Sequence, residues 1–277
     1  MIKSYSKINL FLRILKKNKN SLHNIQSVVM LLNLHDTIKI KFSRKDVIKF
    51  TGKFRSSINK SKNSITKSLS LLRKYNLVNK KQKYKIIVNK KIPVFAGLGG
   101  GTSNAVFLIK YFLKKKINNK LLSIFEKEIG SDFRLFFVNQ VYQKSLKNII
   151  KLKKKYSLFF LLVYPNLKCS TREIYSKVKK YNLPLKNDLS RVQSRSKFIE
   201  FVKNEKNDLQ IIVEKKNKKI KKILNLIKLQ KNCLFSRITG SGSVCFGVFL
   251  NKKSASQGLR SIKKKLPKYW CVITKCI

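Results

Sequence analysis

Alternating apolar and polar residues mark strands in the first part of the chain. Apolar residues recur at every second position over 8–14, and two further apolar segments at 28–34 and 37–42 are separated by the polar pair His35-Asp36. Because alternation with a period of two is typical of half-buried strands, these segments predict three strands, the last two joined by a turn at His35-Asp36. The segment 84–88 predicts a fourth strand.

A period near 3.6 residues marks helices elsewhere. Ile65, Leu69 and Leu72 fall on one face of the segment 61–75, which predicts a helix. A second helix is predicted over 120–129. Gly130 follows its last turn, and glycine at that place commonly ends a helix.

The pattern changes after a lysine-rich stretch in the middle of the chain. The very apolar segment 158–164 predicts a buried strand, helices are predicted to start near Thr171 and Asp208, and residues 236–249 predict a strand, a loop and a strand. We therefore expect two domains of mixed helix and strand, with bounds of 1–150 and 151–277.

The segment from Pro93 to Ala105 carries the most informative composition, because four of the ten glycines fall within 97–101. The apolar-periodic run that starts at Ala105 predicts a helix, with Thr102 or Ser103 as its N-cap. Glycine permits positive φ and close approach of backbone N–H groups to an anion, and a helix N-terminus favours negative charge. The segment therefore predicts a phosphate-binding loop; the alternative is a glycine-rich turn that only packs against a sheet.

Two common phosphate loops do not fit this segment. A Walker A loop ends in Gly-Lys-Ser/Thr, whereas Gly101 is followed directly by Thr102. A dinucleotide-binding fingerprint that starts at Gly97 would need glycine where Thr102 stands, and an acidic residue about 20 positions further on, whereas the nearest is Glu126. Both classes of site are excluded.

The net charge is extreme but evenly spread. The chain has 65 Lys and Arg residues against 11 Asp and Glu residues, a formal charge of +54, which ordinarily favours a nucleic-acid partner. However, Lys, Asn, Ile and Phe are abundant throughout, and these are the residues encoded by codons of A and T alone. We therefore expect no specific nucleic-acid partner, and keep a basic nucleic-acid-binding protein as the alternative from another functional class.

Cysteine usage and hydropathy bound the setting. The five cysteines are odd in number and form no C-x-x-C pair, so we expect a reduced, cytoplasmic environment. No run reaches about 18 uninterrupted apolar residues, which predicts no membrane span. Arg13 interrupts the apolar start and no small-residue cleavage site follows, so no signal peptide is expected.

Two further loops carry residue types suited to chemistry. Gly130-Ser131-Asp132 places a carboxylate, rare in this chain, directly before the apolar segment 133–138, which predicts a strand. Asp132 is either a general base or a turn cap. The loop Thr239-Gly240-Ser241-Gly242-Ser243 is explained equally by phosphate binding and by a hairpin turn.

In order and spacing these loops, together with Ser6-Lys7-Ile8-Asn9, resemble the motifs of the GHMP small-molecule kinases. His23-Asn24-Ile25-Gln26, Asp36-Thr37-Ile38, Ser170-Thr171 with Tyr175, and Asn207-Asp208 resemble most the member of that superfamily whose acceptor is a cytidine-diphosphate-linked sugar alcohol. The resemblance covers nearly the whole chain. It implies a two-domain α+β fold with the active site in the interdomain cleft, and ATP-dependent phosphorylation of a hydroxyl of that small molecule. A homoserine or mevalonate type of kinase is the nearest alternative, and the His23 segment argues against it.

The resemblance also implies roles for residues. Asp132 would take the proton of the acceptor hydroxyl, and Lys7 would hold the reacting groups in line and neutralise charge. The acceptor would be bound by Asn9, His23, Thr171 and Tyr175. ATP, with Mg²⁺ and with Ser103 as a metal contact, would be bound by Asn63, Lys90, Pro93, Val94, Phe95, Ala96, Gly97, Leu98, Gly99, Gly100, Gly101, Thr102, Ser103, Asn104, Gly240, Ser241 and Gly242.

Two of these motifs depart from the family pattern. Leu22 stands where the family usually has tyrosine before the histidine, and Asp132-Phe133-Arg134 replaces Asp-Val-Pro. Leu22 cannot stack on a pyrimidine, so Tyr175 remains as the aromatic residue expected to stack on the base.

Overall fold

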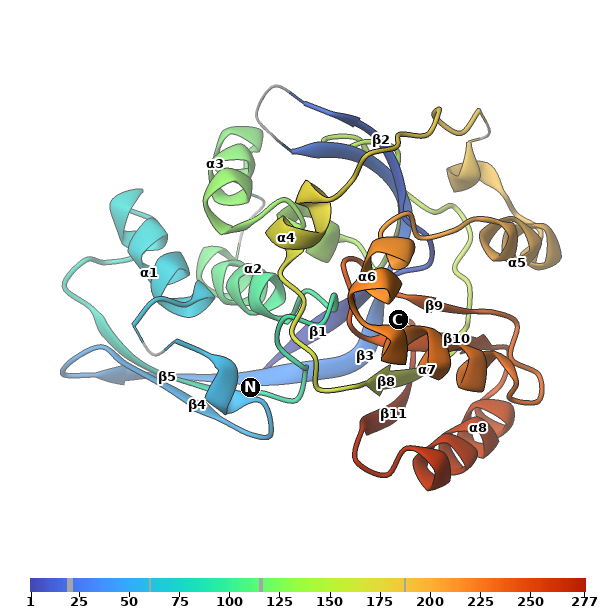
Figure 1. Ribbon diagram of the computed structural model, residues 1–277. Coiled ribbons are helices and arrows are strands. Elements are labelled where there is room, and N and C mark those ends of the chain that lie inside the picture. Colours follow the sequence, from blue (N-terminus) through green and yellow to red (C-terminus); the bar gives the residue numbers. More distant parts are fainter. Residues whose placement is uncertain (19–21, 60, 115–116, 187) are drawn as a thin grey trace. The chain divides into compact units, whose positions relative to one another are not determined.

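The computed structural model describes residues 1–18, 22–59, 61–114, 117–186 and 188–277 (Figure 1). By internal contacts the chain divides into two compact units, each assembled from separated stretches. The first unit is Met1–Ser6, Leu34–Val94 and Gly99–Phe137, and the second unit is Lys7–Asn33, Phe95–Leu98 and Val138–Ile277. The boundary expected near residue 150 stays a prediction.

The first unit is built on strands that pair with the second part of β3 (His23–Ser43). Residues 37–43 of β3 pair antiparallel with β5 (Lys83–Asn89), and β4 (Val47–Thr51) lies parallel to β5. The core contains side chains of these strands and of two helices, because apolar residues alternate along β5 and recur every three or four positions along α1 (Ser64–Lys74). Its buried members are Ile38, Ile65, Leu69, Tyr84, Ile86, Val88 and Leu108.

The predicted turn at His35-Asp36 is wrong, because β3 runs unbroken through it. Asp36 is fully buried, and its carboxylate accepts hydrogen bonds from the backbone N–H groups of Lys91 and Ile92 at 2.7 and 2.9 Å. These bonds satisfy the hydrogen-bonding capacity of the buried Asp36 carboxylate, so the strand continues through this position. The strand predicted over 8–14 is likewise two strands, β1 (Ile2–Asn9) and β2 (Arg13–Lys17).

The helices of the first unit lie close to the ranges that the sequence pattern predicts, except for the first residue of one helix. They are α1 (Ser64–Lys74), α2 (Gly100–Leu113) and α3 (Asn119–Ile129), the last ending at Gly130 as predicted. The predicted N-cap at Thr102 or Ser103 is wrong, because α2 begins among the glycines with Gly99 as its N-cap at φ 67°. A residue without Cβ takes that left-handed conformation without strain, so the helix starts three residues earlier than a side-chain cap would allow.

The strand predicted over 133–138 is also wrong. Residues Phe133–Phe137 form a 3-10 helix with Phe133, Leu135 and Phe136 buried. The backbone N–H of Leu135 donates to the carbonyl of Asp132 at 3.1 Å, a local bond that replaces strand pairing. So short an apolar run is compatible with either conformation.

The second unit contains a four-stranded antiparallel sheet in the order β11-β8-β10-β9. The strands are β8 (Phe159–Tyr164), β9 (Ser236–Ile238), β10 (Cys245–Phe249) and β11 (Trp270–Lys275), which confirms the strand predicted at 158–164 and the strand-loop-strand at 236–249. Helices α7 (Lys218–Lys228) and α8 (Lys252–Lys265) pack on it (Figure 1). In α7, Ile220, Ile223, Leu224 and Ile227 are buried, which is the spacing of one helix face.

The remaining elements of the second unit surround the first part of β3. Residues 23–26 of β3 pair with β2 and residues 27–30 with β6 (Gln140–Gln143), which pairs in turn with β7 (Ile149–Lys151). Three helices complete the unit: α4 (Thr171–Ser176), α5 (Arg195–Asn204) and α6 (Gln210–Lys216). The helices predicted to start at Thr171 and near Asp208 are α4 and α6.

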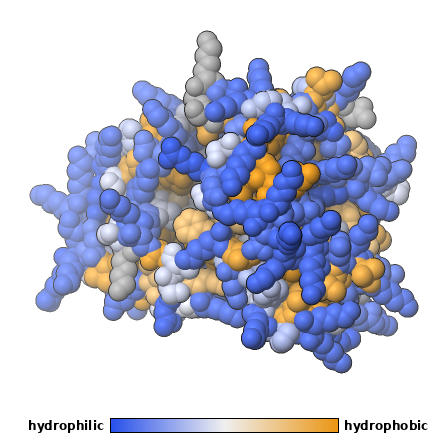
Figure 2. Space-filling model, viewed as in Figure 1, coloured by the Kyte–Doolittle hydropathy of each residue, from blue (hydrophilic) through white to orange (hydrophobic). Residues whose placement is uncertain are grey.

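Figure 2 shows hydrophilic residues over most of the visible face, with smaller hydrophobic areas between them. All five cysteines are free thiols, four of them buried. Within the described ranges, no helix is both long and apolar enough to cross a membrane.

Candidate active site

The two glycine-containing loops that the sequence singled out lie against each other in the second unit. Gly97 has φ 81°, and a Cβ placed on it would lie 2.0 Å from the carbonyl oxygen of Thr239. The Thr239 hydroxyl also donates to the Gly97 carbonyl at 3.4 Å. Only glycine fits at position 97, so the 95–98 and 239–242 loops form one closely packed backbone surface.

Lys7 and Asn9 extend from the end of β1 onto this surface. The buried Lys7 ammonium donates to Asn9 Oδ1 at 2.6 Å, Asn9 Nδ2 donates to Ser27 Oγ at 2.8 Å, and Ser27 Oγ donates to a backbone carbonyl. The Asn9 backbone N–H donates to Thr239 Oγ1 at 3.0 Å. A Cβ on Gly240 would lie 3.4 Å from Lys7 Nζ, so the Lys7 head group lies directly beside the loop.

Thr171, which was predicted to bind the acceptor substrate, joins the same cluster. It begins α4, its side chain is exposed, and its hydroxyl is 3.0 Å from Ser241 Oγ. The second unit thus brings together Lys7, Asn9 and Thr171 with both loops. The sequence pattern did not point to Ser27, because hydroxyl residues are common and its partners lie elsewhere along the chain. Thr239 belongs to a loop that the sequence singled out, but no role was predicted for its hydroxyl.

His23, at the start of β3, lies in an aromatic cluster of the second unit. Its ring centroid is 5.2 Å from that of Tyr175 and 6.1 Å from that of Tyr181. Burial, and the nearby Lys17 cation, lower the pKa of His23, so its imidazole is neutral at pH 7. Tyr175 was predicted to lie at this site, whereas Tyr181 follows no family motif and was missed.

In the first unit, an open groove of about 600 Å³ lies beside the N-terminus of α1. Asn63 lines it and caps α1, accepting hydrogen bonds from the N–H groups of Ile65 and Thr66 at 3.0 Å. Gly101, in the first turn of α2, is close by, since a Cβ on it would lie 4.0 Å from Ser64 Oγ. The first turns of two helices therefore adjoin this groove, and helix N-termini favour anions.

Asp132 lies in the turn between α3 and the 3-10 helix of the first unit. The turn is close to α2, because a Cβ on Gly130 would lie 3.6 Å from Thr102 Oγ1. Arg134, which departs from the family pattern, donates to Glu126 Oε2 at 2.9 Å and to Ser123 Oγ at 3.1 Å. These two bonds tie the turn that contains Asp132 to α3. The departure at Arg134 therefore keeps Asp132 at its place in the turn.

Lys90, Ser103 and Asn104 have buried side chains with partners inside the first unit. Lys90 Nζ forms an ion pair with Asp36 and donates to Asn104 Oδ1 at 2.8 Å. Asn104 Nδ2 donates to Asp36 Oδ2 at 3.0 Å, and Ser103 Oγ donates to the Tyr5 carbonyl at 2.5 Å. Burial lowers the pKa of the Lys90 ammonium, and the Asp36 carboxylate opposes that shift. Because a Cβ on Gly100 would lie 3.6 Å from Lys90 Nζ, this network supports the start of α2 from beneath.

Breaking this ion pair is expected to destabilise the fold. Asp36→Asn leaves the Lys90 cation buried without a countercharge, so the free energy of unfolding should fall by about 3–5 kcal/mol in urea denaturation. Asp46→Asn is the matched control, because Asp46 pairs with Arg73 at a partly exposed site and should cost about 1 kcal/mol or less. Equal losses in the two variants would contradict the role given to the buried pair.

Family models match both parts of the chain. The GHMP kinases N terminal domain matches residues 63–131, and the GHMP kinases C terminal model matches residues 193–268. The first match contains α2 and its glycines, and the second contains the Thr239–Gly242 loop.

Relatives match over the full length. The 4-diphosphocytidyl-2-C-methyl-D-erythritol kinase of Pelagibacter ubique is 37% identical over 285 residues, covering 100% of this chain and 98% of the relative. The enzyme of the same name from Wolbachia pipientis is 30% identical over 289 residues, with 100% and 98% covered.

Solved structures share the fold. A crystal structure of 4-(cytidine 5'-diphospho)-2C-methyl-D-erythritol kinase has a TM-score of 0.74 at 17% identity, covering 99% of this chain and 98% of that one. A mevalonate kinase has a TM-score of 0.68 at 15% identity, with the same coverage. The α+β GHMP fold expected from the sequence is confirmed. The sequence identity to the Pelagibacter enzyme over nearly the full length of both chains then decides the branch: the chain belongs to the 4-diphosphocytidyl-2-C-methyl-D-erythritol kinases of the GHMP superfamily, which makes it an ATP-dependent small-molecule kinase.

Proposed function

We propose that the protein transfers the γ-phosphoryl group of ATP to the 2-hydroxyl of 4-diphosphocytidyl-2-C-methyl-D-erythritol, in the formation of isoprenoid precursors without mevalonate. The full-length similarity to relatives of that name carries the proposal. The acceptor is a cytidine-diphosphate-linked sugar alcohol, and no specific nucleic acid or membrane partner is required. The five free thiols suit a cytoplasmic protein.

ATP fits the first turn of α2 and the groove beside it. The glycines at 99–101 bring backbone N–H groups and the positive end of the helix dipole to one place, where phosphates gain hydrogen bonds and charge stabilisation. Asn63 lines the groove that would take the rest of the nucleotide. When bound, ATP supplies the phosphoryl group that is transferred.

The residues offer no ready-made site for Mg²⁺. No group of three or more His, Cys, Asp or Glu side chains gathers in the part of the chain that the structure describes. Ser103, a predicted metal contact, is fully buried and donates its hydroxyl to the Tyr5 carbonyl. We therefore assign no protein ligand to Mg²⁺; this ion commonly binds through phosphates and waters with few protein ligands.

Asp132 and Lys7 take the chemical roles in this proposal. Asp132 accepts the proton of the acceptor hydroxyl, and its place in a turn fastened by Arg134 keeps the carboxylate in one position. Lys7 neutralises charge that develops on the transferred group. The Asn9–Ser27 chain holds its ammonium in place, so Lys7 needs little reorganisation during the reaction.

His23, Thr171 and Tyr175 bind the cytidine diphosphate portion. A neutral imidazole can both donate and accept a hydrogen bond, which suits the polar edge of a pyrimidine. Thr171 is the first residue of α4, and its hydroxyl, which lies beside that of Ser241, can donate to a phosphate oxygen. Tyr175 offers an aromatic ring next to His23.

The test is an ATP-coupled assay with three acceptors. Purified protein should consume ATP with 4-diphosphocytidyl-2-C-methyl-D-erythritol, and turn over homoserine and mevalonate at background rate. Turnover of either of the latter alone would replace the proposed substrate. Tight DNA binding that persists at physiological salt, without kinase activity, would favour the nucleic-acid alternative, since nonspecific binding fades with salt.

Substitutions at Tyr175 and Leu22, where the pyrimidine is predicted to stack, should change the KM of the acceptor and not the KM for ATP. Tyr175→Ala is expected to raise the KM of the acceptor by about tenfold or more, because stacking of a base on an aromatic ring contributes roughly 1–3 kcal/mol. Leu22→Tyr should lower that KM, while the KM for ATP stays constant in both. Identical acceptor KM values in wild type and both variants would place the pyrimidine elsewhere.

A further inference from the structure

Tyr181 presents an ordered aromatic ring beside His23 without belonging to a core. Its side chain is 47% exposed. The ring lies at 28° to the His23 imidazole plane in a stacked arrangement, with 6.1 Å between centroids. Tyr181 therefore stacks on a polar ring and keeps about half of its surface open to a ligand.

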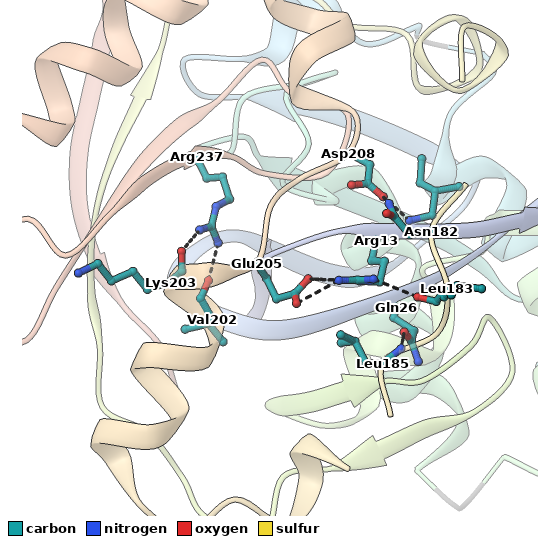
Figure 3. A network of polar contacts seen from close by, with 11 residues as sticks. Arg13, Gln26, Asn182, Leu183, Leu185, Val202, Lys203, Glu205, Asp208 and Arg237 are labelled. Carbon is teal, nitrogen blue, oxygen red and sulfur yellow. Dashed lines mark hydrogen bonds and ion pairs between the residues drawn. The ribbon is translucent and has the colours of Figure 1, made fainter. Parts of the chain in front are cut away.

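The backbone around Tyr181 is held as a strap, which we define as residues 181–185. The Asn182 N–H donates to the Ile14 carbonyl at 2.8 Å, and the Leu183 carbonyl accepts from Arg13 Nη1 at 3.0 Å. The Leu185 N–H donates to Gln26 Oε1 at 2.8 Å. The strap has no regular secondary structure, so these bonds to the β2–β3 hairpin fix its course (Figure 3).

A second layer of charged groups fixes the partners of the strap. Arg13 forms a forked pair with Glu205 at 3.2 and 3.3 Å, so the guanidinium is already oriented toward Leu183. Asp208 Oδ2 accepts from the Ile14 N–H at 2.6 Å and from Asn182 Nδ2 at 2.7 Å. Figure 3 shows Arg13 between the Glu205 carboxylate and the strap.

The anchor of Glu205 is itself rigid. Glu205 directly follows α5, and the buried Arg237 donates to the last carbonyls of that helix, of Val202 at 2.8 Å and of Lys203 at 3.0 Å (Figure 3). Arg237 also donates to the Leu10 carbonyl at 2.6 Å, so the helix end that precedes Glu205 is tied to the core, and the forked ion pair connects it to a segment of five mostly exposed residues. Such a network is out of proportion to the little apolar surface that the strap covers, since Leu183 is 83% exposed.

We propose that Tyr181 is a further substrate-binding residue, which stacks on the pyrimidine base of the acceptor, and that Arg13 is a positioning residue that holds the strap carrying it. The inference rests on the proposed cytidine-containing acceptor. With 6.1 Å between centroids the two near-parallel rings are offset, so a base whose polar edge meets His23 can stack on Tyr181, without help from Leu22, an exposed aliphatic residue. Holding the ring in place before binding removes the entropy cost of ordering it.

The test compares three variants at position 181. Tyr181→Ala should raise the acceptor KM, and the Kd of cytidine 5′-diphosphate in calorimetry, by about tenfold or more. In Tyr181→Phe both constants should stay within about twofold of wild type. The KM for ATP should stay within about twofold of wild type in every variant. Tyr181→Leu keeps apolar bulk without a ring and should resemble Tyr181→Ala. Thermal unfolding of each variant checks the fold. Unchanged KM and Kd in Tyr181→Ala would overturn the inference.

The positioning role has a separate readout. Arg13→Gln should raise the acceptor KM about three- to tenfold with kcat unchanged, and should add nothing in the Tyr181→Ala background, because residues that act through one another are not additive. Equal effects of Arg13→Gln in both backgrounds would overturn this role. Wild-type protein that binds no cytidine 5′-diphosphate would overturn the proposed function as well; binding that is insensitive to Tyr181 would overturn this inference alone.

Discussion

Asp132→Asn is expected to lower kcat by about 10²- to 10⁴-fold, because the amide keeps the shape of the carboxylate but cannot accept the proton of the acceptor hydroxyl. The effect should appear in kcat and in kcat/KM alike, since the base acts only in the transition state. The Kd of ATP should change by less than about twofold, because the substitution leaves the binding groups in place.

A carboxylate remote from the site serves as the control for Asp132. Glu200 in α5 is exposed, so Glu200→Gln makes the same chemical change on the surface and should leave every kinetic constant as in wild type. Steady-state assays with saturating acceptor, and calorimetry with ATP, measure the two effects. Full turnover in Asp132→Asn would assign Asp132 to capping its turn, the alternative that the sequence left open.

Gly99→Val is expected to reduce ATP affinity by about a hundredfold or more, because a β-branched residue is strained at positive φ and its side chain fills the phosphate cradle. Gly99 has φ 67° and is the N-cap of α2, so the added atoms stand at the place where the helix dipole meets the anion. Calorimetry with ATP measures the affinity, and circular dichroism checks that the variant folds.

Gly101→Ala separates backbone strain from blockage of the ligand. Gly101 lies in the first turn of α2, and a Cβ there would meet no atom outside its own helix nearer than 4.0 Å among the described residues. The fold therefore tolerates alanine, which has the higher helix propensity. Weaker ATP binding in a protein of unchanged or higher stability would locate the phosphates over this turn. Unchanged affinity in both folded variants would mean that the glycines only pack.

Local patterns predicted most of the elements but failed where distant partners decide. The pair His35-Asp36 resembles a turn because two polar residues interrupt an apolar run. Asp36 stays in a strand because Lys90, 54 residues further along, supplies its countercharge. The 3-10 helix after Asp132 was missed for another reason, since an apolar run of so few residues shows no period that separates strand from helix.

The candidate site was predictable where glycines or a rare acid mark it. Gly97 requires its residue type because a Cβ there would lie 2.0 Å from the Thr239 carbonyl oxygen, and Gly240 favours glycine because of its positive φ of 53°. Lys7 is one of many lysines, and only the family motif distinguished it. Tyr181 and Arg13 gave no signal, because their significance arises from a strap folded onto a hairpin about 170 residues away along the chain, as the Arg13–Leu183 bond shows.

The division of the chain into interleaved stretches has a consequence for its synthesis on the ribosome. The second unit needs residues 7–33 together with 138–277, and the backbone N–H of the last residue, Ile277, donates to the carbonyl of Leu31 at 3.0 Å. An emerging N-terminal part therefore has to reach residues 140–143 before β3 can pair with β6, and residues 276–277 before Leu31 and Leu32 gain their C-terminal partners in that unit. At about 5–20 residues per second this delay lasts many seconds, during which apolar strands are open to aggregation and to chaperones.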